Sequence, residues 1–480
     1  MYADQMLDEE QLDRAHTVAE SVRAELNFDE ALRPYESLCH DGRTVDGAQL
    51  HLEDVTGIPF VSQVSGVEEY QHRARVRADT EDMFAAVTTP VDGYESYCRE
   101  RLDLGQPELL QVEPTGGPMA IASACREPAN LARIADFATQ SDGLVIHPYM
   151  AIEPVWELAS ELAERGVDVE VLGPPPPILW LANDKGRLAR LVDRLTDGAW
   201  NVQTHLEDQP DRMVDRLVEL AEGYDLVGLK RTRCASAMGN IVFEAPTIKS
   251  AGRAALGRQV RAFLDHTEWE DGEPVLAVEW ADTDLSPSTQ MWIPAPEVGP
   301  VRLDGVYQQI LSGTERVFVG SRPSTLPKPV EHELIEASFM MGTVFQKLGY
   351  VGRCSFDFIV VGDPHEDWSV CMTECNGRWG GTSTPMHLVD RLADGPRPWY
   401  VAQDFVHPEL KGRRFLDVLE AVGAELYDAT TGEGRFVFYN PGPLNEHGKI
   451  DVIALGESPE KARSAVEQTL PRLLDLEPRR

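Results

Sequence analysis

One stretch of the sequence restricts the fold more than any other. Residues 142–177 read DGLVIHPYMAIEPVWELASELAERGVDVEVLGPPPP. Apolar runs at 144–146 and 167–172 enclose an amphipathic run at 155–165, which predicts a strand, a helix and a second strand. Such a β-α-β unit requires a parallel sheet with a right-handed crossover, so the sequence predicts an α/β fold. The prolines that follow predict a stiff linker at 173–177.

Further helical and strand patterns follow this linker. Apolar spacing predicts a helix at 185–195 capped by Asn183 or Asp184, a helix near 212–222, strands at 226–230 and 274–281, and helices at 331–348 and 459–470. Pro471 should end the last of these helices, because proline lacks a backbone N–H. Within the region 1–140 only a helical run at 8–26 is assigned.

Residues 353–376 predict an antiparallel hairpin. The strand RCSFDFIVV is followed by the hydrophilic turn GDPHEDW and the strand SVCMTECN. Because side chains alternate along a strand, Glu374 and Asn376 should share one face. The opposite face should carry Cys371, Thr373 and Cys375. On the first strand, Asp357 should share its face with Ser355, while Phe356 and Phe358 face apolar packing.

This hairpin is also a candidate metal site. If the strands pair across the turn, Asp357 and Glu374 approach each other and Asn376 adds a neutral oxygen beside them. Two carboxylates and an amide oxygen suit Mg²⁺, and Mn²⁺ would accept the same ligands. Arg378 adds a donor fork for a phosphate or carboxylate oxygen. The alternative is that the two acids are solvated edge residues of a very acidic protein.

Charge and composition restrict the partners. The chain has 480 residues and a net charge of -36, from 80 acids against 44 bases, of which only eight are lysines. Such a surface repels nucleic acid and anionic membranes, and its acidity is typical of proteins from salt-accumulating halophiles. An acidic N-terminus and the lack of a long apolar run predict a cytoplasmic protein. The seven cysteines form no CxxC pair, which disfavours zinc and favours buried, reduced thiols.

Several of these segments resemble the ATP-grasp ligases. The acid, hairpin and ECNGRWGG sequence is similar to the metal-binding end of that family. Upstream, LANDKGRLARLV, YDLVGLKRTRCASAMGN and VLAVEW resemble its nucleotide-binding segments in the same order. An ammonium at the end of an apolar strand, as in YDLVGLK, needs an anionic partner or solvent.

The resemblance implies roles for single residues. Asp357, Glu374 and Asn376 would hold the metal, and Arg378 would stabilise an acyl phosphate and the tetrahedral intermediate. Lys230 would act in catalysis and in phosphate binding. The remaining nucleotide contacts would be Lys185, Ser236, Gly239, Asn240 and Glu279. The loop departs from the family pattern, because Gly239 is its only glycine where the family commonly has several.

Residues 374–385, ECNGRWGGTSTP, fit one branch of the family position by position, the pheganomycin-type peptide ligases. The fold implied is α/β (α+β), with a pre-ATP-grasp domain at 1–177, an ATP-grasp domain at 178–400 and a small C-terminal extension at 401–480. The region 1–140 could contribute to the acceptor pocket or to a homodimer contact.

The activity implied is an ATP-dependent carboxylate-amine ligase that forms an amide or peptide through an acyl phosphate and releases ADP and phosphate. Its partners would be a small-molecule or peptide carboxylate and an amine. Two alternatives remain at this stage: a phosphotransferase acting on a non-carboxylate acceptor, and a nucleotide-binding regulatory protein without turnover. Thr382, Ser383 and Thr384 would bind a carboxylate or stabilise a turn, and His387 is a candidate base.

Overall fold

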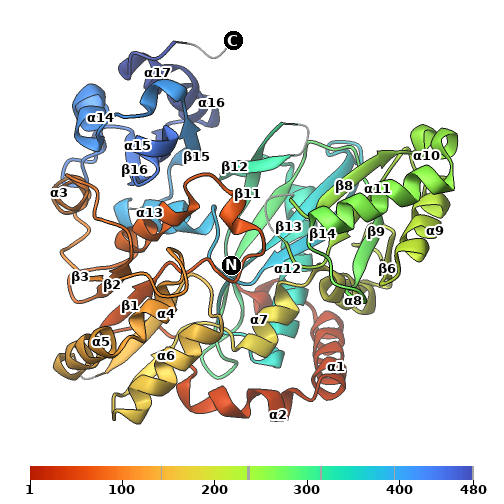
Figure 1. The fold of residues 1–480 in the computed structure, drawn as a ribbon, viewed down its shortest axis with the longest axis horizontal. Helices are drawn as coiled ribbons and strands as arrows, with labels where there is room; N and C mark the ends of the chain where they lie inside the picture. Colours follow the sequence, from red (N-terminus) through yellow and green to blue (C-terminus); the bar gives the residue numbers. More distant parts are fainter. Residues whose placement is uncertain (142, 235–237, 314–315, 394, 478–480) are drawn as a thin grey trace.

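The computed structural model describes residues 1–141, 143–234, 238–313, 316–393 and 395–477, and within these its strands form three sheets (Figure 1). The predicted β-α-β unit is confirmed. The strands β4 (Leu144–Pro148) and β5 (Val169–Val171) pair in parallel, and α6 (Glu153–Glu164) connects them. They form one side of a parallel sheet in the order β3-β2-β1-β4-β5.

The region 1–140 supplies the other three strands of this sheet. These are β1 (Gln49–Leu52), β2 (Met83–Ala86) and β3 (Glu108–Gln111), all parallel to their neighbours. Each has only four residues, and β1 carries the buried His51. β1 and β3 mix polar with apolar residues, and β2 is apolar but only four residues long, so none of them gives a pattern long enough to predict a strand. The helices of this region are α3 (Tyr94–Glu100), α4 (Ile121–Cys125) and α5 (Pro128–Gln140).

The predicted helix at 8–26 is confirmed as α1 (Glu9–Glu25), with Asp8 as its N-cap. After α2 (Phe28–Leu32) the chain moves on to the parallel sheet. The helix α1 itself packs against α8 (Lys185–Thr196) and α12 (Lys328–Leu348) in one apolar core. The start of the chain thus supports the part of the protein that carries the hairpin.

The proline-rich stretch at 173–177 is not the extended spacer that the sequence predicts. Pro174, Pro175 and Pro176 are buried, and Pro176 begins α7 (Pro176–Ala182). Proline fits the first turn of a helix because the N–H it lacks would have no partner there. After α7, Asp184 caps α8, and both this cap and the helix were predicted.

A small antiparallel sheet follows in the order β6-β9-β7-β8. Its strands are β6 (Thr204–Glu207), β7 (Leu226–Arg231), β8 (Asn240–Glu244) and β9 (Val275–Glu279). Its helices are α9 (Pro210–Leu220), α10 (Ala245–Ala251) and α11 (Arg253–His266), which share an apolar core with it. The predicted helix near 212–222 and the strands at 226–230 and 274–281 are confirmed here.

A large antiparallel sheet in the order β14-β13-β10-β11-β12-β15-β17-β16 fills the middle of the molecule (Figure 1). Its strands are β10 (Pro287–Ile293), β11 (Arg302–Ser312), β12 (Val317–Pro323), β13 (Gly352–Asp363), β14 (Asp367–Asn376), β15 (Trp399–Val406), β16 (Phe436–Asn440) and β17 (Lys449–Gly456). The predicted hairpin is β13 and β14. The predicted boundaries 1–177, 178–400 and 401–480 stay predictions, and this sheet crosses the last of them.

One short ladder joins the two halves of the large sheet. The strands β12 and β15 pair through Gly320 with Gln403 and Ser321 with Ala402. A Cβ atom added at Gly320 would lie 2.3 Å from the carbonyl oxygen of Ala402, so no larger residue fits at this crossing. This ladder connects the hairpin half to the C-terminal strands.

The C-terminal helix does not end at Pro471. It runs as α16 (Pro459–Ser464), a π-helical turn η7 (Ala465–Thr469) and α17 (Leu470–Leu473), with Pro471 in the first turn of α17. The wider turn changes the hydrogen-bond register ahead of the proline, so the helical path continues. The remaining helices are α13 (Ser383–Leu392), α14 (Phe415–Val422) and α15 (Leu444–His447).

The 3₁₀ helices are η1 (Ala3–Gln5), η2 (Arg33–Leu38), η3 (Val61–Gln63), η4 (Val67–Val76), η5 (Pro408–Leu410) and η6 (Gly423–Glu425). Among the described residues, none of the helices has both the length and the apolar character needed to cross a lipid bilayer.

Candidate active site

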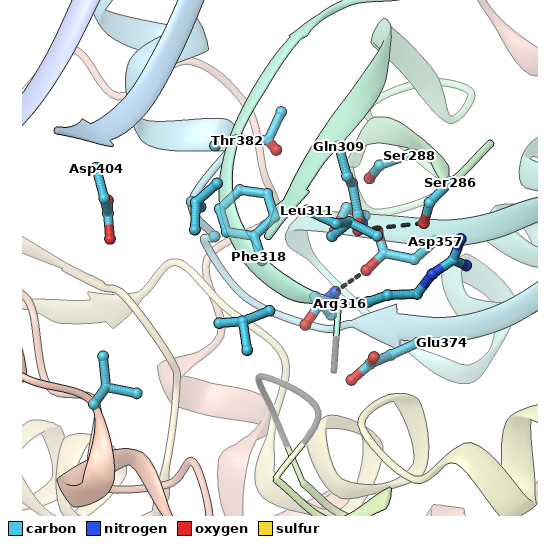
Figure 2. Close-up of a pocket in the computed structure, with 18 of the residues that line it drawn as sticks. Ser286, Ser288, Gln309, Leu311, Arg316, Phe318, Asp357, Glu374, Thr382 and Asp404 are labelled. Carbon is cyan, nitrogen blue, oxygen red and sulfur yellow. Dashed lines mark hydrogen bonds between the residues drawn. The ribbon is translucent and has the colours of Figure 1, made fainter. Parts of the chain in front are cut away.

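A cavity of about 510 Å³ lies where the three sheets approach one another. The small sheet contributes Lys230 and Glu279, the hairpin contributes Asp357 and Glu374, and the segment after β4 contributes Tyr149. Figure 2 shows Asp357 and Glu374 on one side of this space and Asp404 of β15 on the other. The predicted acids and one predicted lysine therefore meet in one cavity.

The hairpin register brings the acids together as predicted. Asp357 pairs with Glu374, and Ser355 pairs with Asn376, while Phe356 is in the core. The prediction for Thr373 is wrong, because a register shift after Asp357 interrupts the alternation of β14 and Thr373 also lines the cavity. Cys375 is in the apolar core, as predicted.

The surroundings of Asp357 disfavour the ionised form of its carboxyl group. Burial, and then the adjacent Glu374 carboxylate, raise the pKa of Asp357 to about 6. Hydrogen bonds from Ser288 and Gln309 work in the opposite direction. Asn376 donates from Nδ2 to Asp357 Oδ2 at 2.9 Å. Two neighbouring carboxylates in one cavity favour a bound cation or a shared proton.

Lys185 is hydrogen-bonded to Glu374. Its ammonium donates to Glu374 Oε1 at 2.9 Å and to the Cys234 carbonyl oxygen at 2.7 Å. Burial disfavours the charged form, yet Cys234 and Glu374 raise the pKa of Lys185 above its ordinary value. The α8 cap, Asp184, fixes the start of the helix from which Lys185 extends. The ammonium predicted to reach phosphate thus contacts a predicted metal ligand.

Lys230 lies on the cavity wall, 4.7 Å from the centre of the Trp280 ring. Burial, and then the positive charge of Lys185, lower the pKa of Lys230 to about 8. A buried ammonium beside a second ammonium gains stability from any anion that enters the cavity. The position therefore suits an anionic ligand.

Arg378 connects the hairpin to the parallel sheet. Its guanidinium donates to Asn376 Oδ1 at 2.7 Å, to the Tyr149 hydroxyl at 3.1 Å and to the Trp379 carbonyl oxygen at 2.8 Å. Because Asn376 accepts from Arg378 and donates to Asp357, its amide oxygen points away from the Asp357 carboxylate. The two carboxylates offer oxygen ligands to a divalent cation once Glu374 leaves Lys185, and the amide would join them after a rotation that releases Arg378.

Comparisons with known proteins agree with this geometry at the level of the fold. No protein-family model matches the sequence, and no curated protein matches it significantly. Solved structures do match. N5-carboxyaminoimidazole ribonucleotide synthetase in complex with ADP superimposes with a TM-score of 0.53 at 12% identity, over 92% of this chain and 98% of that one.

Two further structures agree. The Aspergillus clavatus N5-carboxyaminoimidazole synthase, in complex with ADP and 5-aminoimidazole ribonucleotide, gives a TM-score of 0.52 at 12% identity, over 89% of this chain and 99% of that one. The biotin carboxylase domain of Hydrogenobacter thermophilus 2-oxoglutarate carboxylase, in complex with ADP and bicarbonate, gives 0.51 at 13% identity, over 89% and 93%. The chain has the ATP-grasp fold. The finer resemblance to pheganomycin-type peptide ligases stays a prediction.

Only some of the other nucleotide contacts predicted from the ATP-grasp resemblance line the cavity. Asn240 and Glu279 line the cavity, and Glu279 Oε2 accepts from the Gln203 backbone N–H at 3.0 Å. Gly239 packs against Cys234, where an added Cβ would lie 2.5 Å from the sulfur. Ser236 lies outside the described residues.

The predicted residues that follow the β13-β14 hairpin lie in different surroundings. Thr382 lines the cavity, whereas the Ser383 hydroxyl accepts a hydrogen bond from the Gly380 N–H at 2.6 Å and stabilises the turn. His387 packs edge-on against Trp379 at 5.4 Å between ring centres. Burial, and then Arg353, lower the pKa of His387 well below its ordinary value. A buried neutral imidazole in this contact does not fit the role of a base in the cavity.

Sequence reasoning missed several residues of the cavity. One wall of the cavity includes Ser286, just before β10, and Ser288 and Gln290 of β10, which alternate in SPSTQ, so the period-two pattern could have revealed them. Arg316, which pairs with Asp284 at 2.7 Å, also lines the cavity. No local pattern marks Arg73, Asp404 and Lys449, because they meet only through the fold.

Proposed function

We propose that the chain is an ATP-dependent carboxylate-amine ligase that acts through an acyl phosphate. The observation that carries this proposal is the pairing of Asp357 with Glu374 across the hairpin, in the same cavity as Lys230. Carboxylates for a cation and an ammonium for phosphate are the groups that nucleotide-dependent phosphoryl transfer needs. The fold adds support, because solved structures with this fold contain ADP or ATP.

Asp357 and Glu374 would hold Mg²⁺, and Asn376 would join them after rotation of its amide. When bound, the ion would neutralise charge on the phosphates. Occupation of this site would also withdraw Glu374 from Lys185, so that the Lys185 ammonium becomes available to the nucleotide. Lys230 would contact the phosphates, and Asn240 and Glu279 would contact the rest of the nucleotide.

In the first step, an oxygen of the substrate carboxylate attacks the γ-phosphorus of ATP, the bond to the β-phosphate oxygen breaks, and ADP leaves. In the second, the amine nitrogen attacks the acyl carbon, the bond from that carbon to the phosphate oxygen breaks, and the amine loses one proton. The products are an amide, ADP and phosphate. Arg378, held by Tyr149 and Trp379, would stabilise the negative oxygen of the acyl phosphate and of the tetrahedral intermediate.

The test is incubation with ATP, Mg²⁺ and a pool of amino acids and short peptides, with hydroxylamine as a trapping nucleophile. A hydroxamate together with ADP supports the ligase. ADP with a phosphorylated, non-carboxylate acceptor supports a phosphotransferase instead, and ATP binding without ADP formation supports a regulatory protein. Either of the last two results contradicts the proposal.

A further inference from the structure

The middle of the cavity is lined by apolar side chains from two parts of the chain. The first pair belongs to the large sheet, where Leu311 of β11 and Phe318 of β12 are cross-strand partners that both line the cavity. In the order of this sheet, β11 and β12 are the second and third strands from β13, which carries Asp357. We call Leu311 and Phe318 the sheet wall, and it lies beyond the acids of the hairpin.

A second apolar wall comes from the segment between β1 and η4. Ile58, Val61 and Val64 line the cavity, and each packs against the core of the parallel sheet. All three are only partly buried, so each keeps apolar surface for a ligand to cover. We call these three residues the loop wall. Apolar walls with a few well-placed polar groups are typical of small-molecule sites.

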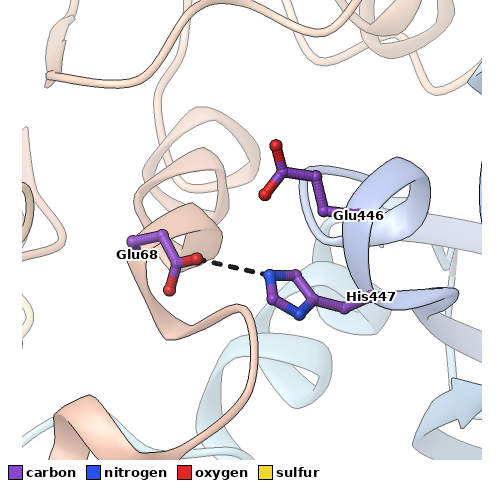
Figure 3. A group of neighbouring side chains, drawn as sticks. All are labelled: Glu68, Glu446 and His447. Carbon is purple, nitrogen blue, oxygen red and sulfur yellow. Dashed lines mark hydrogen bonds and ion pairs between the residues drawn. The ribbon is translucent and has the colours of Figure 1, made fainter.

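The end of the loop wall is held in place by α15. Ser65 follows Val64, and its hydroxyl oxygen lies 2.8 Å from His447 Nδ1. On its other side, His447 Nε2 lies 3.3 Å from Glu68 Oε1. Figure 3 shows His447 beside Glu68, with Glu446 close to both. Because the imidazole contacts residues on both sides of it, this group anchors the loop wall to the C-terminal part of the protein.

Arg378 is close to the sheet wall. The turn after β14 brings Gly381 against Phe318, because a Cβ atom added at this glycine would lie 2.4 Å from the phenylalanine ring. A Cβ atom added at Gly380, the neighbouring residue, would lie 3.7 Å from Arg378 Nη1. The guanidinium and the phenyl ring therefore lie beside the same pair of glycines.

Arg378 is also close to the loop wall. Its guanidinium donates to the Tyr149 hydroxyl at 3.1 Å. Met150 follows Tyr149, and a Cβ atom added at Gly57 would lie 2.9 Å from the methionine sulfur. Gly57 precedes Ile58, the first residue of the loop wall. A carboxylate bound to this guanidinium would therefore have apolar surface on either side of it.

The guanidinium of Arg378 has donors left for such a carboxylate. In the described part of the chain, its hydrogen bonds to Tyr149, Trp379 and Asn376 use both N–H groups of Nη1 and one of Nη2. The remaining N–H groups, on Nε and Nη2, point to one edge of the guanidinium. A carboxylate can accept from both with its two oxygens.

The charged residues at the opposite end of the cavity do not favour a second charge on the ligand. Arg73, Lys449 and Asp404 line that end, so an ammonium would meet more positive than negative charge. Lys449 lies 2.5 Å from Asp404, and Arg73 lies 2.6 Å from Asp451. A second anionic group would have to displace one of these acids from its partner. The cavity thus favours a ligand that is uncharged beyond its first carboxylate.

We propose that the acid substrate is a monocarboxylate with an apolar body. Its carboxylate lies against the free edge of Arg378, and its carbon chain lies between the sheet wall and the loop wall. The role of this carboxylate as the group that is phosphorylated rests on the proposed ligase function, but its binding does not require ATP.

The test measures binding of three acids of similar length to the full chain without nucleotide, by ligand-observed NMR titration at pH 7.5. We expect 5-methylhexanoate to bind about tenfold more tightly than 6-aminohexanoate, which carries an ammonium, because burial of its branched chain stabilises the complex. Adipate, which carries a second carboxylate, should also bind about tenfold more weakly. Equal or tighter binding of 6-aminohexanoate or adipate would overturn the inference.

One variant in each wall tests where the chain lies. Leu311→Asn and Val61→Thr make a wall polar at nearly unchanged size, so each should weaken binding of 5-methylhexanoate severalfold. Binding of acetate should stay unchanged, because acetate has no chain to reach the walls. Leu416→Asn and Val218→Thr, at exposed positions on α14 and α9, are the matched controls and should change neither affinity.

Val61→Thr is the milder change and keeps the test valid if Leu311→Asn does not fold. Binding of 5-methylhexanoate that the folded wall variants leave unchanged would overturn the inference. Hydroxamate formation from the same acids with ATP and Mg²⁺ is measured separately. Binding of 5-methylhexanoate without ADP or hydroxamate contradicts the ligase and supports the apolar walls. Hydroxamate formed from adipate or 6-aminohexanoate as fast as from 5-methylhexanoate supports the ligase and contradicts the apolar walls.

Discussion

Two buried carboxylates, Asp357 at the hairpin end of the cavity and Asp451 at the opposite end, are held in different ways. At the hairpin end, Asp357 faces a second acid, Glu374, and Lys230 lies on the wall beside the Trp280 ring. At the opposite end of the cavity, which η4, β15 and β17 line and which we call the far end, the acid Asp451 is held by Arg73 through two hydrogen bonds.

The difference is visible in the ionisation of the acids. Burial and Glu374 raise the pKa of Asp357 to about 6. Burial also works against ionisation of Asp451, but Arg73 and Lys449 hold its pKa below the usual range. A second carboxylate lies beside Asp357, whereas the chain's own cations neutralise Asp451, so the hairpin end is the better place for a ligand that brings positive charge.

The comparison is tested most strongly by removing a charge from the hairpin end. Glu374→Gln and Lys230→Ala should each lower ADP formation by at least about 1,000-fold, because both act on the charge of the transferring phosphate. Circular dichroism should show that both variants remain folded. The exposed residues Glu222 and Lys328 supply matched controls, Glu222→Gln and Lys328→Ala, which should retain activity. Full activity in both Glu374→Gln and Lys230→Ala would contradict the assignment of these two residues to the active site.

At the far end, the equivalent change should affect stability. Arg73→Met leaves the Asp451 carboxylate buried and unpaired, which costs about 3–5 kcal/mol in comparable cases. We expect the Tm to fall by at least about 5 °C. The surface variant Arg414→Met should change it by no more than about 1 °C, because exposed pairs contribute little. A Tm as high as that of the wild type in Arg73→Met would mean that the far end is not fixed by its ion pairs.

Replacement of an aspartate by asparagine should change the Tm in opposite directions at the two ends of the cavity. A carboxyl whose pKa is raised in the folded state contributes stability below its unfolded pKa and loses it as the pH rises through about 6. In EDTA at pH 7.5, Asp357→Asn should therefore raise the Tm by a few degrees, and the gain should vanish near pH 4. At the far end, Asp451→Asn should lower the Tm, because Arg73 and Lys449 hold the pKa of Asp451 below its usual range and would lose this partner. Thermal scans at both pH values give the comparison, and equal signs would contradict it.

The smallest effect should come from a neutral hydrogen-bond donor at the hairpin end, Ser288. Ser288 donates to Asp357 and so favours its ionised form. Ser288→Ala should move the acidic limb of the pH dependence of ADP formation to higher pH and lower activity at pH 7 only severalfold. The matching change Ser250→Ala, on a helix away from the cavity, should leave the profile in place. An unmoved limb in Ser288→Ala would show that Asp357 does not set it.

The sequence predicted the parts of the site that lie close together in the chain. Asp357 and Glu374 follow from strand alternation and a short turn, and both were placed correctly relative to each other. The register shift that turns Thr373 into the cavity was not predictable, because a bulge leaves no mark in the alternation of residue types. The Lys185 contact with Glu374 joins residues 189 positions apart and needs the fold.

The region 1–140 was the largest omission, and the reason is physical. Strands of four residues, one of them with a buried histidine, are stabilised by their neighbours in the sheet and not by their own composition. In sequence, Arg73 and Arg77 are typical of a charged surface helix, yet both are buried against carboxylates, Asp451 and Glu53. Partners so far apart along the chain cannot be read from local patterns.

The ladder between β12 and β15 has a mechanical consequence. It is the narrowest place in the large sheet, two residue pairs wide, and Gly320 leaves no space for a side chain. If the protein is pulled mechanically, β12 and β15 should separate before the other strand pairs of this sheet, because few hydrogen bonds bear the force between them. Gly320→Val would place a side chain in this ladder. It would separate the half of the sheet that carries Asp357 from the half that carries Asp404.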